Sequence, residues 1–278
     1  MDLSIIIAHY DPGNHSECMK SFRNTLNQIT QQKENFSIEV IIADDGSTYH
    51  KYILEHFSKK ISHNGRDIYS LQGEQLQYWL KKLLIKESPI SNWLYLPKEK
   101  PQMGKARIGN EAIEMAESEN ILFLDDDNYF ISQNSIATIM DLIRNYHLVF
   151  GQIKDSNGRL RPFSSNRVQG TTFVVKKYII KNCGGFGEWT EKVSSGVDSD
   201  IWWKLYCYFQ KNPELKACFT SKIQTLDSCS KRWKPHIKYL FRHRVVRKEF
   251  NKVHGCSDYR NIKTNPSRVK ANWMDDLS

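Results

Sequence analysis

The chain of 278 residues has no apolar run that approaches the roughly 18 residues required by a membrane-spanning helix. Its start, MDLSIIIAHYDPG, lacks the charged leader and the long apolar segment of a signal peptide. The six cysteines form no CxxC pair and no Cys/His spacing typical of a metal site, which favours separate, reduced thiols over disulfides. From these absences we expect a cytoplasmic protein without disulfides.

Internal repeats and low-complexity tracts are also lacking. Hydrophobic residues make up 40% of the sequence, which is enough for a sizeable core. A chain of this length can form one large α/β domain or two small ones, and we expect it to be globular.

The positive charge is concentrated near the C-terminus. The formal net charge is +9, and residues 231–252 alone hold nine Lys/Arg and one Glu, which amounts to +8. The rest of the chain is therefore nearly neutral, whereas a nucleic-acid-binding protein of this size more often spreads its basic residues over a groove or face. The distribution indicates a basic extension after about residue 230 and no nucleic-acid partner.

Hydrophobic periodicity indicates that the chain starts as a β-α-β unit. Strands are expected at residues 4–8 and 38–43, with a helix over residues 14–28 between them. The apolar residues of this helix recur at helical spacing: Cys18, Phe22, Leu26 and Ile29. Asn14 and Glu17 are placed as a capping box at its start. A β-α-β unit implies a parallel sheet.

The remaining pattern continues the alternation of helices and strands. We expect helices at 50–58, 72–86, 105–118 and 198–209, and strands at 93–96, 121–124, 147–153 and 171–176.

Carboxylates follow two of the predicted strands. Asp44 and Asp45 come after strand 38–43, and Asp125, Asp126 and Asp127 come after strand 121–124. In an open parallel sheet, ligands bind outside the carboxyl ends of the strands, so both groups should face one crevice. Adjacent carboxylates repel one another unless a cation or hydrogen-bond donors compensate them. The triple aspartate therefore predicts a bound cation or hydrogen-bond donors that compensate its charge.

Four segments in order resemble glycosyltransferase family 2. SIIIAHYDPG resembles the family's opening strand and loop, EVIIADDGST its second-strand motif, GKARIGNEAIEMAESENILFLDDDN its helix, strand and DxD segment, and GVDSDIWWKL its later acidic motif. Together they span residues 4 to about 207. The resemblance implies a GT-A, Rossmann-like α/β domain over residues 1–230, with a mostly parallel central sheet flanked by helices. A basic, mainly helical extension, residues 231–278, would follow.

The resemblance implies Mn²⁺ or Mg²⁺ at the triple aspartate. Mg²⁺ prefers one or two carboxylates together with substrate phosphates, and alternate side chains of an extended segment point the same way. Asp127 is the expected direct ligand together with Asp125, and Asp125 or Asp126 would contact ribose or metal-bound water. The alternative is a solvated acidic turn.

By the same resemblance, further residues would bind the nucleotide: Ala8, Tyr10, Asp45, Gly104, Lys105 and Arg107. Asp45 is expected to contact uracil, although one of Asp44 and Asp45 could instead only cap the next helix. Lys105 and Arg107 begin a helix whose positive dipole end favours phosphate, but they could equally be solvent-exposed. The family's usual Arg-Asn pair is replaced by Gly109-Asn110.

Asp198 matches the position of the family's catalytic base. The family usually has Glu-Asp there, and this chain has Val197-Asp198. An inverting sugar transfer needs such a base to take the proton of the acceptor hydroxyl. An aspartate at a helix start is also a common N-cap, and Asp200 is a competing candidate for the base.

The expected activity is inverting, non-processive transfer from a UDP-sugar to a hydroxyl of a glycan or a lipid-linked saccharide. A sugar-phosphate nucleotidyltransferase is the enzyme alternative, but it would need a basic, glycine-rich loop where residues 9–13 read HYDPG. A non-catalytic, basic membrane- or nucleic-acid-binding module is the other, and the triple aspartate would repel nucleic acid.

The basic segment 231–252 leaves three interpretations open. Its apolar residues Ile237, Leu240, Phe241 and Val245 form a stripe that could lie on an anionic membrane surface. It could equally close over the diphosphate. A third possibility is packing on the catalytic domain, which the positions of Val246 and Phe250 outside the stripe favour.

Overall fold

The architecture comes from a computed structural model of the chain. The structure describes the following residues: 1–13, 16–33, 36–48, 59–85, 88–98, 104–162, 169–228, 238–256 and 273–277. The predicted helix at 50–58 and the capping residue Asn14 lie outside these ranges.

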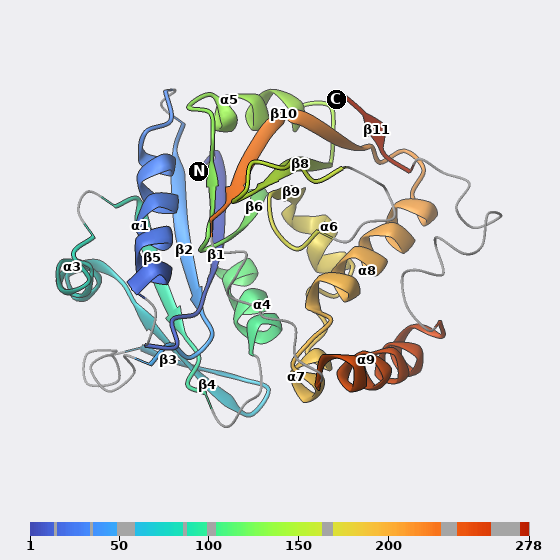
Figure 1. Cartoon of the computed structure of the whole chain (residues 1–278), viewed down its shortest axis with the longest axis horizontal. Coiled ribbons are helices and arrows are strands. Elements are labelled where there is room, and N and C mark those ends of the chain that lie inside the picture. The colour runs from blue at the N-terminus through green and yellow to red at the C-terminus, as the bar shows by residue number, and fades with distance from the viewer. Residues whose placement is uncertain are drawn as a thin grey trace.

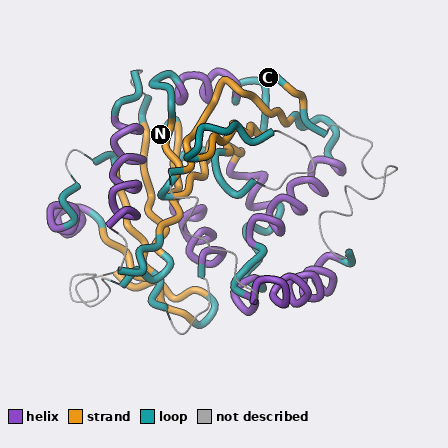
Figure 2. The backbone as a smooth tube through the Cα atoms, viewed as in Figure 1, coloured by secondary structure: helices purple, strands orange, loops and turns teal. Residues whose placement is uncertain are grey.

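One sheet runs through the whole molecule, with four parallel strands at its centre (Figures 1 and 2). These strands are, in sheet order, β6 (Asn120–Asp125), β1 (Leu3–His9), β2 (Ile38–Asp44) and β5 (Ile90–Tyr95). All four carry apolar side chains toward both faces, as expected for parallel strands that are covered on both sides. The predicted β-α-β start and the predicted mostly parallel central sheet are confirmed.

Antiparallel strands extend this centre on both sides. The hairpin of β3 (Lys59–His63) and β4 (Arg66–Leu71) adds to β5. On the other side, β9 (Phe173–Lys176) pairs antiparallel with both β6 and β8 (Leu148–Asp155).

Beyond β8, strand β10 (Ala217–Asp227) pairs parallel with it, and β11 (Asp275–Asp276) forms the edge. The short β7 (Asn128–Phe130), directly after the triple aspartate, pairs antiparallel with β10.

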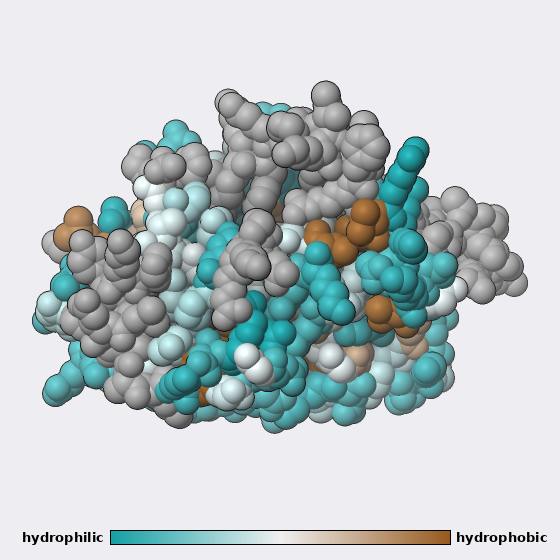
Figure 3. Space-filling view, turned by 90° about the horizontal axis from the view of Figure 1, so that it is seen from below, coloured by the Kyte–Doolittle hydropathy of each residue, from teal (hydrophilic) through white to brown (hydrophobic). Residues whose placement is uncertain are grey.

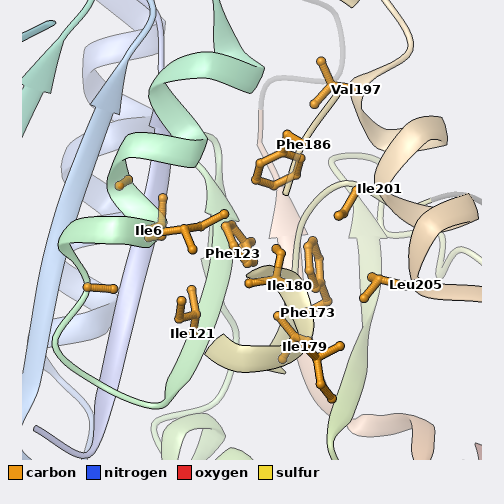
Figure 4. Close-up of a cluster of buried hydrophobic side chains, with 14 of the residues drawn as sticks. Ile6, Ile121, Phe123, Phe173, Ile179, Ile180, Phe186, Val197, Ile201 and Leu205 are labelled. Atoms are coloured by element: carbon orange, nitrogen blue, oxygen red, sulfur yellow. The ribbon is translucent and has the colours of Figure 1, made fainter. Parts of the chain in front are cut away.

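Helices cover both faces of the sheet (Figure 1). The described helices are α1 (Ser16–Thr30), α3 (Gly73–Lys82), α4 (Lys105–Met115), α5 (Ser135–Leu142), α6 (Lys177–Asn182), α7 (Thr190–Val193), α8 (Val197–Lys211) and α9 (Lys238–His254). Helices α1, α3 and α5 pack on one apolar cluster, and α4, α6 and α8 on the other (Figure 4).

Alternation along the central strands produces the two clusters. In β1, Ile5 and Ile7 belong to the α1 side, while Ile6 belongs to the α4 side. In β6, Leu122 and Leu124 likewise face α1, while Phe123 faces α4. The alternation therefore decides which layer each side chain at a strand end will meet.

Two predicted helices end earlier than expected. The helix expected at 72–86 stops at Lys82 because Leu84 adopts a left-handed conformation with φ of 55°, and the amides of Leu84 and Ile85 bond back to the last turn. The helix expected at 105–118 stops at Met115, since Ala116 is extended.

The C-terminal helix α9 packs on the domain rather than standing apart from it. Phe250 is buried, and its ring lies 6.0 Å from that of Trp189 and 6.3 Å from that of Trp203. The domain boundary proposed near residue 230 falls in residues 229–237, outside the described ranges. Among the helices that the structure describes, none combines the length and apolarity needed to cross a bilayer.

Candidate functional site

The carboxyl ends of β1, β2 and β6 bring the predicted site residues side by side. The strand register places Ala8 opposite Ala43 on one side and opposite Asp125 on the other. His9 is the partner of Asp44 in the next position of the sheet. The two acidic turns predicted to share a crevice therefore lie on either side of the end of β1.

Asp125 continues the α4 side of β6 and meets Lys105 there. Lys105 Nζ lies 2.9 Å from Asp125 Oδ1 and 3.8 Å from Asp198 Oδ1. Burial works against the charge of this lysine, but Asp125 and Asp198 outweigh that effect and hold the pKa of Lys105 above its ordinary value. Asp127 contributes in the same direction. Lys105 is thus surrounded by carboxylates from β6, from the turn after it and from the start of α8.

Asp126 continues the opposite side of β6 and is buried against β1. Its Oδ2 lies 2.7 Å from His9 Nδ1 and accepts a hydrogen bond from the Tyr10 amide at 3.2 Å. His9 in turn stacks on Phe22 of α1, with 4.4 Å between ring centroids. The predicted nucleotide contact Asp126 is only 1% exposed and fixes the loop after β1.

Asp127 is held at the end of the turn between β6 and β7, directly before Asn128. Its Oδ1 accepts a hydrogen bond from Asn128 Nδ2 at 2.9 Å, and its backbone carbonyl accepts bonds from the amide and the hydroxyl of Ser228. Because Ser228 directly follows β10, the far half of the sheet helps to fix the triple aspartate.

The donor set fits a hard divalent cation that is shared with phosphates. Among the residues that the structure describes, no group of three or more His, Cys, Asp and Glu side chains could hold a metal ion. The carboxylates of Asp125 and Asp127 are nevertheless the oxygen ligands that Mg²⁺ or Mn²⁺ prefers, and one or two of them suffice when phosphates complete the shell. In the structure, the cation beside Asp125 is the Lys105 ammonium, 2.9 Å away.

Asp44 and Asp45 have separate environments. Asp44 is fully buried and accepts hydrogen bonds from the Ser47 amide at 2.9 Å and from Trp93 Nε1 at 3.1 Å, so it supports the turn. Asp45 Oδ1 accepts a hydrogen bond of 2.6 Å from the amide of Gly104, the N-cap of α4. Burial raises the pKa of Asp45 to about 7. Asp45 therefore ties the turn after β2 to the N-cap residue of α4.

Tyr10 lies beside this turn in the loop after β1. Lys98 Nζ sits 3.9 Å from the centroid of its ring, a cation–π contact. The charge of Lys98 also acts on Asp45 and lowers its pKa against the effect of burial. Tyr10 and Asp45, both predicted to contact the nucleotide, thus share a cationic neighbour.

Arg107 points away from the triple aspartate. Its Nε and Nη2 form a two-point ion pair with Glu191 of α7, at 2.9 and 3.1 Å. Its Nη1 donates to the carbonyls of His63 and Asn64 at the tip of the β3–β4 hairpin. Lys105 and Arg107 were both predicted to bind phosphate. In the structure, Lys105 lies beside the acidic cluster, whereas Arg107 connects α4 to α7 and to the β3–β4 hairpin.

Asp198 and Asp200, the two candidates for the base, have opposite surroundings. The side chain of Asp198 is 47% exposed and lies near Lys105. Asp200 is fully buried. The interpretation of Asp198 as an N-cap is wrong, because Gly196 occupies the N-cap position of α8 with φ of 96° and no side chain caps that end.

Asp200 connects several segments through its carboxylate. It accepts hydrogen bonds of 2.7 Å from the Gly187 amide and from Trp189 Nε1, and Lys204 Nζ lies 3.0 Å away. His254 Nε2 of α9 lies 2.8 Å from its Oδ1. Burial alone would raise the pKa of Asp200, but these partners, His254 foremost, lower it. The start of α8 is thereby fixed by the segment of Gly187 and Trp189, by α9 and, within α8 itself, by Lys204.

Sequence reasoning missed His9, Gly170 and His254. A single histidine carries no pattern that reveals a partner more than fifty residues away. Gly170 lies so close to Asp198 that a Cβ atom there would collide with the carboxylate. This contact, too, joins segments that are separate in the sequence.

A pocket at the strand ends joins several of the predicted residues. Its lining includes Ala8, Lys105, Gly109, Asp125, Gly170 and Phe186. The absence of a side chain at Gly109 makes room for Phe186, whose ring atoms a Cβ atom would meet at 3.1 Å. Asn110 holds the same segment, because its side chain exchanges hydrogen bonds with the backbone of Phe186.

Comparison by sequence finds no relative: no family model and no curated protein matches the chain. Solved structures match it in fold. S. aureus TarS superposes with a TM-score of 0.56 at 17% identity, over 90% of this chain and 40% of that one. The 1–349 fragment of S. aureus TarS in complex with UDP-GlcNAc gives a TM-score of 0.52 at 18% identity, over 90% and 67%.

A further match is the mannosyltransferase PcManGT from Pyrobaculum calidifontis in complex with GDP-Man and Mn²⁺. Its TM-score is 0.56 at 14% identity, over 90% of this chain and 63% of that one. This chain thus spans 40% of the first TarS chain and 63% of the mannosyltransferase. The predicted fold class is confirmed: it is an α/β fold, with a mostly parallel central sheet flanked by helices, similar to that of glycosyltransferases.

Proposed function

We propose that the protein is an inverting, non-processive glycosyltransferase of family 2. It would transfer a sugar from a UDP-sugar to a hydroxyl of a glycan or a lipid-linked saccharide. The observation that carries the proposal is the placement of Lys105 between Asp125 and Asp198, because a phosphate-binding cation, a metal-binding carboxylate and an exposed carboxylate then meet at one edge of the sheet. The fold neighbours with UDP-GlcNAc and with GDP-Man and Mn²⁺ support it.

Each group has a role in this proposal. Tyr10 and Asp45 would hold the base, with Asp45 accepting a hydrogen bond from a uracil N–H. The first turn of α4, which begins at Gly104 and Lys105, would face the diphosphate with its positive dipole end. Ala8, at the end of β1, lines the pocket beneath.

Asp125 and Asp127 would hold Mn²⁺ or Mg²⁺ together with the phosphates. When bound, the cation supplies Lewis-acid stabilisation of the diphosphate leaving group. Asp126, which is buried against His9 and the Tyr10 amide, would keep the loop of Tyr10 in place. We propose this positioning role in addition to the contact to ribose inferred from the sequence.

Asp198 would act as the general base. Its carboxylate is exposed enough to reach an acceptor hydroxyl, and the Lys105 ammonium keeps it near Asp125. Taking the hydroxyl proton makes the oxygen a better nucleophile toward the anomeric carbon, on the face opposite the diphosphate. Asp200 is unsuited to this task, because its lone pairs are already engaged by donors in the interior.

Calorimetric titration of UDP and GDP, with Mn²⁺ or with a chelator, tests the proposal. The wild type should bind UDP in a metal-dependent manner, and Asp127→Ala should lose this binding because it removes a metal ligand. Asp198→Asn should keep UDP binding but lose the release of UDP from UDP-sugars, since only the proton acceptor is gone. Asp141→Ala removes an exposed carboxylate of α5 and serves as the control. Failure of the wild type to bind any nucleotide would refute the proposal.

A further inference from the structure

Lys105 is placed between two carboxylates that the proposed reaction uses differently. Its ammonium group is 2.9 Å from Asp125, at the end of β6, and 3.8 Å from Asp198, in the first turn of α8. The side chain is largely buried, with 24% of it exposed, so solvent screens these contacts only in part. One cation therefore links the expected metal ligand to the expected base.

A divalent cation on Asp125 and the ammonium of Lys105 compete for the same oxygens. Like charges a few ångströms apart repel one another, and a divalent ion repels the ammonium more strongly than a monovalent ion would. The donor's diphosphate changes this balance, because it offers the ammonium another negative partner and offers the metal more oxygen ligands.

The local structure allows the ammonium to change partner without unfolding the helix. Lys105 is the first residue of α4, and the preceding amide of Gly104 is fixed by its 2.6 Å hydrogen bond to Asp45. The backbone is therefore anchored, while four methylene groups let the ammonium swing.

We propose that Lys105 is an internal counter-ion that makes metal binding at Asp125 and Asp127 depend on the diphosphate of the donor. Without the diphosphate, the ammonium neutralises Asp125 and keeps Mn²⁺ affinity low. With it, the ammonium moves to the phosphate oxygens and leaves the carboxylates to the metal. Lys105 is thus a positioning residue that couples the two ligands, and this inference rests on the proposed function above.

The coupling can be measured without turnover. Mn²⁺ is titrated, with free ion followed by electron paramagnetic resonance, into the protein with and without saturating UDP. The ratio of the two affinities is the coupling factor, and by linkage Mn²⁺ changes UDP affinity by the same factor. Lys105→Met should bind Mn²⁺ alone at least about tenfold more tightly than the wild type, since a cation 2.9 Å from Asp125 is removed. The coupling factor should fall accordingly.

Lys204→Met is the matched control. Lys204 also pairs with a carboxylate, at 3.0 Å from Asp200, and its side chain is 19% exposed, so both variants lose one largely buried cation. Lys204→Met should keep the wild-type Mn²⁺ affinity if the effect is local to Asp125. An equal rise in both variants would reduce the effect to net charge and overturn the proposal.

Two further variants keep the test decisive. Lys105→Gln keeps a polar side chain without the charge, replaces the methionine variant if that variant does not fold, and should give the same result. Lys105→Arg keeps the positive charge and should behave as the wild type. In one outcome, the wild type binds UDP and Mn²⁺ together, and Lys105→Met and Lys105→Gln have the same coupling factor as the wild type. That result would refute the counter-ion role of Lys105 and leave the transferase proposal standing. If the wild type binds no nucleotide, both are refuted.

Discussion

Replacing Asp45 by asparagine should stabilise the protein at alkaline pH. Burial raises the pKa of Asp45 from 3.8 to about 7 in the folded protein. Between about pH 4 and pH 7 the unfolded chain has released this proton while the folded chain still holds it, so stability falls as pH rises. Above pH 7 the difference corresponds to at most about 4 kcal/mol of unfolding free energy.

The asparagine side chain in Asp45→Asn would be neutral at every pH and could still accept the hydrogen bond from the Gly104 amide, because its Oδ1 replaces that of the carboxylate. Urea denaturation, followed by tryptophan fluorescence from pH 4.5 to 8.5, gives the unfolding free energy of Asp45→Asn and of the wild type. The variant should gain stability relative to the wild type as pH rises and reach a plateau above pH 7. Asp141→Asn, at a side chain that is 72% exposed, is the control and should change nothing. Parallel profiles for Asp45→Asn and the wild type would refute the assignment of a buried, hard-to-ionise carboxyl.

Two further predictions concern the other side of the site and the C-terminal helix. Gly170→Ala should lower turnover about a hundredfold, because the added Cβ atom displaces the Asp198 carboxylate. UDP affinity, measured by calorimetry, should stay the same. Unchanged turnover would contradict the role of Asp198. If α9 contacts an anionic membrane, the double variant Arg244→Gln/Lys248→Gln should bind vesicles containing phosphatidylglycerol roughly thirtyfold more weakly, at about 1 kcal/mol per lost cation. Both residues are exposed, and equal sedimentation of the wild type with neutral vesicles would exclude an electrostatic contact.

The exposed surface around α9 is mixed in character. Val245 and Val253 are 51% and 50% exposed, whereas Phe250 on another face of the helix is buried. On the face seen in Figure 3, the coloured residues are mostly hydrophilic, with a few apolar patches among them. Of the predicted apolar stripe, Ile237 lies outside the described residues, as do the side chains of Leu240 and Phe241.

The central strands and the strand-end carboxylates could be predicted from sequence because their signals are local. Alternation in β6 places Asp125 and Asp126 on opposite faces of the sheet, so that Asp125 meets Lys105 and Asp126 meets His9. The β3–β4 hairpin also had a local signal that was overlooked. Asn64 and Gly65, with φ of 46° and 77°, form the kind of two-residue turn that an Asn-Gly pair favours.

The roles of Arg107 and Asp200 could not be predicted, because distant segments determine them. Arg107 is drawn to Glu191 across more than eighty residues, and only the folded chain brings them together. Asp200 resembles Asp198 in the sequence, yet tertiary contacts bury one and expose the other. Strand β10 was not predicted either, and therefore neither was the contact of Ser228, the residue after this strand, with the Asp127 carbonyl.

The contacts of Asp200 have a consequence for folding during synthesis. Synthesis runs from the N-terminus, and strands β1 to β10 and α8 leave the ribosome before α9 does. A chain that has not yet exposed His254 buries the Asp200 carboxylate without one of its partners, which costs about 1.5–3 kcal/mol for a hydrogen bond to a charged group. The start of α8, and with it Asp198, would settle only after α9 has docked. A chain whose synthesis has not yet reached α9 would then lack a fully ordered site.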